Sequence, residues 1–177
     1  TVASGAILQL YGSETVSTPT LSSGSTVKYT GDGDSAADSY TLKAWTYHHL
    51  TVAQTDSADS LTASGTVTVG GNFSLSGGTF TAPTTLNVAG NFSNSGGTFT
   101  HNSGTVVLNG TDQTISGSTT FYNLTKQNST NDSTNETLTF TSGTTQTIAG
   151  ALTLDGLDAN DMLLIRATAS SAATIDF

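Results

Sequence analysis

A repeat of 19 residues most constrains how this chain can fold: Phe73 and Phe80 recur as Phe92 and Phe99 (92−73, 99−80). Within each period, short segments of alternating apolar and polar residues are separated by glycines, which is typical of β-strands joined by tight turns. One coil cannot bury its own apolar face, so coils must stack. The repeat therefore predicts an all-β, single-domain parallel β-solenoid with three short strands per coil of about 19 residues. A β-sandwich with an accidental repeat is the alternative. In the solenoid, Phe73 stacks on Phe92 and Phe80 on Phe99, as a core ladder.

The strand pattern continues on both sides of this repeat. We divide the chain into residues 1–21, an N-terminal strand and polar lead-in expected to join subunits, and residues 22–177, the solenoid domain. The segment Gly143–Gly150 resembles Gly110–Gly117 at an offset of 33 residues (143−110). We attribute the extra length to a polar, solvated excursion over residues 126–136.

The charge balance excludes several kinds of partner. The chain carries 13 acidic residues and 4 Lys or Arg, a net charge of −9. That is too little positive charge to hold a nucleic-acid backbone or an anionic membrane surface. No apolar run approaches the ~20 residues of a membrane span, and no cysteine is present. The composition and the start at Thr1 fit a mature secreted protein as well as a fragment, so we expect an extracellular or cell-surface location.

Five segments carry a resemblance to a known group of proteins. They are Gly90–Thr100, Asn102–Gly110, Gln113–Gly117, Thr120–Thr125 and Leu163–Asp176. These segments resemble repetitive extracellular β-rich surface proteins of uncultivated and candidate-phylum bacteria, and the likeness covers about residues 22–177. The resemblance implies a secreted or surface protein without known catalytic residues.

One acidic loop is a candidate metal site. Asp32, Asp34 and Asp38 could supply the oxygen ligands that Ca²⁺ prefers. The loop lacks the EF-hand pattern, since Lys43 occupies the place of the bidentate Glu. A solvated acidic turn is the other reading, and no further cofactor is expected. A second, weaker cluster consists of Asp155, Asp158, Asn160 and Asp161.

Histidine and aromatic residues offer weaker candidates. His48 and His49 are adjacent, so on a strand they would point to opposite faces and could not share a metal ion. Trp45, Tyr47 and Tyr122 could form an aromatic platform for sugar rings, although such residues more often belong to a core.

The sequence shows no residue pattern that is typical of an enzyme active site. The carboxylates lie mostly in turns, the four basic residues fall in separate coils, and no Ser-His-Asp arrangement is visible. We therefore predict that the protein is not an enzyme. Asn128, Asn131 and Asn135, in the polar excursion, are candidate glycan carriers in a host that glycosylates.

The two ends of the chain suggest self-assembly. Ile7, Leu8 and Leu10 form an apolar N-terminal strand, and Ile175 and Phe177 close the chain in a strand pattern. Open solenoid ends attract other strands. The sequence thus predicts a structural subunit of an extracellular filament or cell-surface assembly, with copies of itself as partners. The alternative is an adhesive or carbohydrate-binding module that contacts surface glycans, and a polysaccharide-active enzyme ranks third.

Overall fold

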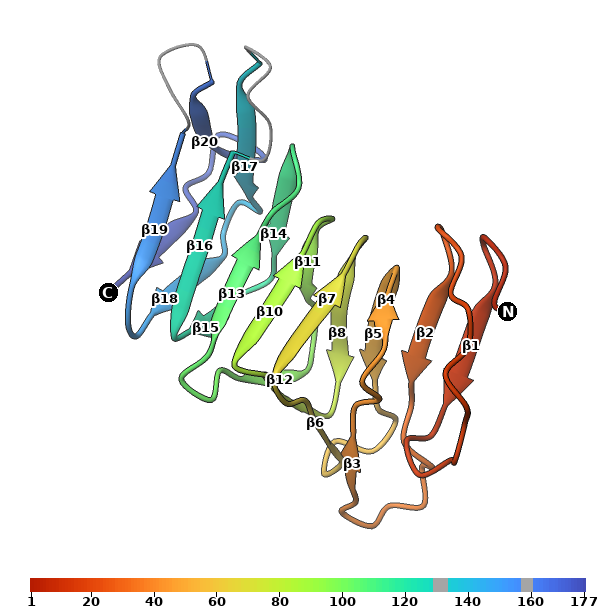
Figure 1. Ribbon diagram of the computed structural model, residues 1–177. Coiled ribbons are helices and arrows are strands. Elements are labelled where there is room, and N and C mark those ends of the chain that lie inside the picture. Colours follow the sequence, from red (N-terminus) through yellow and green to blue (C-terminus); the bar gives the residue numbers. More distant parts are fainter. Residues whose placement is uncertain (129–133, 157–160) are drawn as a thin grey trace.

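The computed structural model describes residues 1–128, 134–156 and 161–177. Within these ranges the regular elements are β-strands, and the paired strands run parallel (Figure 1). The first sheet has eight strands: β1 (Ile7–Leu10), β2 (Thr26–Tyr29), β5 (His49–Ala53), β8 (Phe73–Gly77), β11 (Phe92–Asn94), β14 (Gln113–Ser116), β17 (Glu136–Phe140) and β20 (Leu163–Ala167). Neighbouring strands of this sheet come from successive coils, so the order of the strands is the order in which the coils stack.

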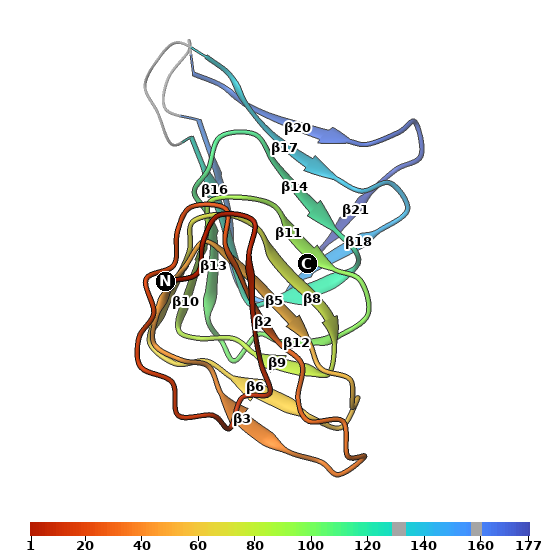
Figure 2. The same cartoon turned by 90° about the vertical axis from the view of Figure 1, so that its right-hand side faces the viewer.

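Three further sheets complete the walls. The second sheet contains β4 (Thr46–Tyr47), β7 (Thr66–Val69), β10 (Thr85–Val88), β13 (Thr105–Leu108), β16 (Asn123–Gln127) and β19 (Leu152–Asp155). The third contains β3 (Ser39–Thr41), β6 (Ser60–Thr62), β9 (Thr79–Thr81) and β12 (Thr98–Thr100), and the fourth contains β15 (Thr119–Phe121), β18 (Thr145–Ile148) and β21 (Thr174–Asp176). Figure 2 shows these walls enclosing the interior.

The parallel β-solenoid expected from the repeat is confirmed, and the sandwich alternative is not. Coils recur on average about every 22 residues. The 19-residue period holds between Phe73 and Phe92, which are register partners. Elsewhere the step is longer: Leu50 pairs with Phe73, 23 residues on (73−50), and Leu138 with Ile165, 27 residues on (165−138). Extra residues are accommodated in the corners, where surface loops tolerate insertion.

The core ladder forms as the repeat predicts. Phe73 and Phe92 stack with ring centroids 5.1 Å apart, and Phe80 and Phe99 lie 6.0 Å apart. Phe121 extends the ladder by one coil, 5.2 Å from Phe92. All five rings are buried. Burial of such a side chain is worth about 1.5–3 kcal/mol, so this stack is a main source of stability.

A second ladder, made of polar groups, runs along the corner between the second and first sheets. The backbone N–H of Asn72 donates to His49 Nδ1 (2.9 Å). The N–H of Asn91 donates to Asn72 Oδ1 (2.9 Å), and the N–H of Thr114 donates to Asn91 Oδ1 (2.8 Å). Each side chain thus satisfies a backbone amide of the next coil, at the corner or just inside the following strand, which explains why an asparagine precedes both Phe73 and Phe92.

The similar segments Gly110–Gly117 and Gly143–Gly150 do not stack on each other. The first contains β14 of the first sheet and the second contains β18 of the fourth. The register partner of Ile115 is Phe140. Each segment instead makes the same kind of hydrogen bond, from its glutamine side chain to a glycine carbonyl of the preceding coil. Gln113 Nε2 donates to Gly90 O (2.6 Å), and Gln146 Nε2 donates to Gly117 O (2.8 Å). The interpretation of the 33-residue offset as a lengthened coil is therefore wrong.

The N-terminal strand is part of the same stack. β1 pairs in register with β2, and Leu10 lies buried opposite Tyr29. The first sheet therefore shows no break between residues 1–21 and the rest. The two termini lie at opposite ends of the solenoid (Figure 1). In the described ranges, no helix is long and apolar enough to cross a membrane.

Candidate functional site

In the part of the chain that the structure describes, three strands of the last coil have no partner on their outer side. β19, β20 and β21 are the outermost strands of the second, first and fourth sheets. Each pairs with a strand of the preceding coil on one side only. Unpaired backbone donors and acceptors make such edges a template for another strand.

The interior of the solenoid reaches the surface at this end. Leu138 is 0% exposed, whereas its register partner in the last coil, Ile165, is 46% exposed. Leu154 and Met162 are also exposed, and Phe177 is 81% exposed. Ile165 lies over the buried Leu138 and Leu154 over the buried Lys126, and in the described residues each is covered by the preceding coil on one side. The last coil therefore presents apolar groups beside free strand edges, a combination typical of interaction surfaces.

The opposite end is more closed. Val2 and Leu21 form a parallel bridge, and Val16 and Leu21 pack against the core. Leu10 is buried, while Leu8 is half-buried and Ile7 exposed. The residues predicted for assembly therefore fall into two groups at the two ends: Ile7, Leu8 and Leu10 at one, and Ile175 and Phe177 at the other.

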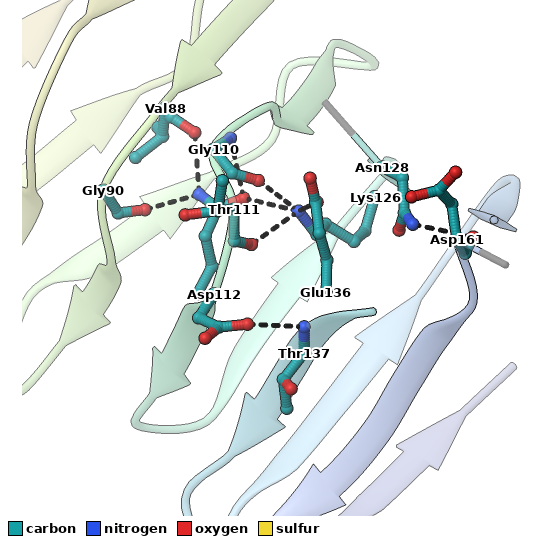
Figure 3. A network of polar contacts seen from close by, with 11 residues as sticks. Val88, Gly90, Gly110, Thr111, Asp112, Lys126, Asn128, Glu136, Thr137 and Asp161 are labelled. Carbon is teal, nitrogen blue, oxygen red and sulfur yellow. Dashed lines mark hydrogen bonds and ion pairs between the residues drawn. The ribbon is translucent and has the colours of Figure 1, made fainter. Parts of the chain in front are cut away.

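A buried ion pair lies inside the coil that precedes the last one (Figure 3). Lys126 Nζ lies 2.9 Å from Glu136 Oε2, and Lys126 is 0% exposed. The ammonium also donates to Thr111 O (2.9 Å), Gln113 Oε1 (3.2 Å) and Gly110 O. These acceptors, from the corner of the preceding coil, compensate for the removal of Lys126 from water. Through these contacts Lys126 ties its own coil to the preceding one.

The placement of Lys126 and Glu136 corrects the solvated excursion expected over residues 126–136. Both side chains point inward and are buried. The strand alternation carried the signal: inward Leu124 predicts an inward residue at 126, and inward Leu138 predicts one at 136. Opposite charges at those two places could have indicated a pair.

The acidic loop brings its three carboxylates together. Ligand oxygens of Asp32, Asp34 and Asp38 lie within 4.8 Å of one another. Of the second cluster, Asp161 is buried, Asp155 ends β19, and Asp158 and Asn160 lie outside the described residues.

The candidate glycan carriers differ in their accessibility. Asn128 is 4% exposed and its Nδ2 donates to Asp161 O (2.8 Å), so it is not available for a glycan. Asn135 is exposed, and its Oδ1 accepts from Met162 N. Asn131 lies outside the described residues.

The two adjacent histidines are closer than strand alternation predicts. The rings of His48 and His49 lie 4.3 Å apart, because the chain turns between β4 and β5. Burial, and then the neighbouring His48, lower the pKa of His49 from its ordinary 6.5. His48 Nδ1 is buried without a hydrogen-bond partner. The expectation that the rings point apart is wrong.

The aromatic platform does not form. Tyr47 is buried in the core, where its hydroxyl donates to Lys43 O. Trp45 packs against the core beside it, 6.2 Å from the Tyr47 ring. Tyr122 instead lies against His101, 5.5 Å away.

Comparisons of the chain with protein-family models, with curated proteins and with solved structures gave no match. Function must therefore be argued from the geometry of the chain itself.

Proposed function

We propose that this protein is a structural subunit of an extracellular filament or cell-surface assembly, in which copies join head to tail through the last coil. The observation that carries the proposal is the exposure of Ile165, whose register partner Leu138 is fully buried. Covering such apolar area releases about 25 cal/mol per Å². A further coil on this end would supply that cover.

The sheet topology supports a head-to-tail joint. β1 and β20 are the two outer strands of the same sheet. A second copy that places its β1 beside β20 continues this sheet with parallel strands. Such a contact joins two different surfaces that lie at opposite ends of the solenoid, so copies stacked along its axis do not close into a ring and produce a fibre.

End-to-end stacking is better supported than insertion of the N-terminal strand into a neighbour. β1 already pairs with β2 of its own chain and buries Leu10. Insertion into another copy would first break these contacts. The adhesive alternative has less support, since Tyr47 lies in the core and cannot contact a sugar.

The test is electron microscopy and light scattering of the purified protein over a range of concentrations. The matched variants are Leu154→Glu and Thr153→Glu, neighbours on opposite faces of β19. We expect fibres from the unmodified chain and from Thr153→Glu, and monomers from Leu154→Glu, where a charge would enter the joint.

Two outcomes would overturn the assembly role. One is a monomer at every concentration, and the other is equal fibre formation by both variants. In the monomer case, a glycan array with a Trp45→Ala control would test the adhesive alternative.

A further inference from the structure

A separate feature lies on the corner between the first and third sheets, far from the last coil. The loop that joins β2 to β3 carries Asp32, Asp34 and Asp38, with ligand oxygens within 4.8 Å of one another. Ca²⁺ holds its oxygen ligands at about 2.3–2.6 Å, so two ligands on opposite sides of one ion are separated by up to about 5 Å. The three carboxylates are therefore spaced closely enough to share one ion.

The next coil places a fourth carboxylate at the base of this loop. Asp59, between β5 and β6, is 0% exposed. Its Oδ1 accepts from the backbone N–H of Asp38 (3.0 Å). Its Oδ2 lies so close to Gly31 that a Cβ there would overlap it. The carboxylate therefore points between the two ends of the loop that holds the triad.

Asp59 Oδ2 has no hydrogen-bond partner. A buried carboxylate oxygen without a partner is costly. In the part of the chain that the structure describes, the ion pair found is Lys126–Glu136, so none of these aspartates is paired with a Lys or Arg. A cation in the loop would compensate for this negative charge.

The surroundings of the loop are acidic throughout. Asp56, in the β5–β6 corner, adds a further aspartate next to Asp32, Asp34, Asp38 and Asp59. A polar pocket beside the loop is lined by Gly33, Ser35, Thr55, Asp56 and Ser57. This pocket places further oxygen atoms and room for water next to the loop, and a hard cation prefers such ligands.

We propose that Asp32, Asp34 and Asp38 bind a divalent cation, with Ca²⁺ as the best fit, and that buried Asp59 of the next coil positions their loop and adds negative charge. The ion would tie the β2–β3 loop to the β5–β6 corner. A flexible loop with carboxylate and water ligands suits Ca²⁺ better than Mg²⁺, which demands near-ideal octahedral geometry. The site is independent of the proposed assembly.

The test is calorimetric titration and thermal melting of the chelator-treated protein with Ca²⁺ and, separately, Mg²⁺. We expect one Ca²⁺ per chain, a rise of several degrees in Tm, and weaker binding of Mg²⁺. Asp34→Asn should lower Ca²⁺ affinity at least tenfold. The control is Asp112→Asn, in a different corner, where the amide oxygen can still accept from Thr137 N; its Ca²⁺ affinity should be unchanged.

A second variant distinguishes a role of Asp59 in Ca²⁺ binding from a role in the stability of the fold. Asp59→Asn removes the buried charge, so it should leave the ion-free protein at least as stable while it weakens Ca²⁺ binding. Two results would overturn the proposal: no heat and no Tm shift with millimolar Ca²⁺, or an identical Ca²⁺ response in the unmodified chain and Asp34→Asn.

Discussion

The central coils and the last coil share one backbone geometry but differ in what covers them. Phe92 of β11 is enclosed by rings from the coils on both sides. Ile165 of β20 has a neighbour on one side and is 46% exposed. In a stacked architecture a coil derives its stability from its neighbours. The same side-chain truncation should therefore cost far more in the centre than at the end.

The largest effect is expected in the central ladder. Phe92→Ala should lower the free energy of unfolding by about 4 kcal/mol, because it removes an aromatic side chain from a fully packed position. Chemical denaturation monitored by circular dichroism would measure this. Ser93→Ala, on the outer face of the same strand, should change stability by no more than about 0.5 kcal/mol. Similar losses in the two variants would contradict the ladder as the main source of stability.

Stability should be nearly as sensitive to changes in the buried Lys126–Glu136 ion pair, for a different reason. Lys126→Met leaves Glu136 buried without its ammonium partner, which should cost about 3 kcal/mol. The double variant Lys126→Met/Glu136→Leu should recover most of this loss, because it removes both charges. A double variant as unstable as the single one would show that the pair is not the determining interaction.

Two glycines with similar backbone conformations allow the cost of a steric overlap between coils to be measured separately from the cost of a positive φ. Gly117 and Gly143 have φ of +79° and +77°. A Cβ on Gly117 would overlap Asn94 O, whereas one on Gly143 meets nothing within 4 Å. Gly117→Ala should cost about 2 kcal/mol or more, and Gly143→Ala about 1 kcal/mol, the price of the backbone conformation alone. Equal midpoints in urea would exclude a close contact at Gly117.

The last coil should tolerate truncation. Ile165→Ala should lower the free energy of unfolding of the monomer by about 1 kcal/mol or less, since much of this side chain is already in water. Dilute protein must be used for this measurement. A loss as large as that of Phe92→Ala would mean that the last coil is covered in solution.

The smallest effect concerns pH. The pKa of His49 is lowered below its ordinary 6.5, so the folded state favours the neutral ring. The contribution of neutral His49 to the free energy of unfolding is fully present above about pH 6.5, and it is lost as the pH falls through the lowered pKa. Protonation also removes the acceptor of Asn72 N–H. Melting curves from pH 8 to 5 should fall more steeply for the unmodified chain than for His49→Asn; parallel curves would assign the pH dependence to other groups.

The sequence alone determined the architecture of the central coils. The offset between Phe73 and Phe92 placed them in register, because parallel stacking repeats whatever the sequence repeats. Alternation within each strand separated buried from outer residues. The repeat offset and the alternation within a strand are properties of short sequence segments, so they can be read without knowing how distant parts of the chain meet.

Which residues meet across coils and corners depends on how the coils are placed on one another in three dimensions. Asp59 lies against Asp38 of the preceding coil, although 21 residues separate the two in the sequence. A corner also brought the rings of His48 and His49 together. The physical reason is that loop length and the turn at each corner set the phase between neighbouring coils, and neither is visible in the alternation of a single strand.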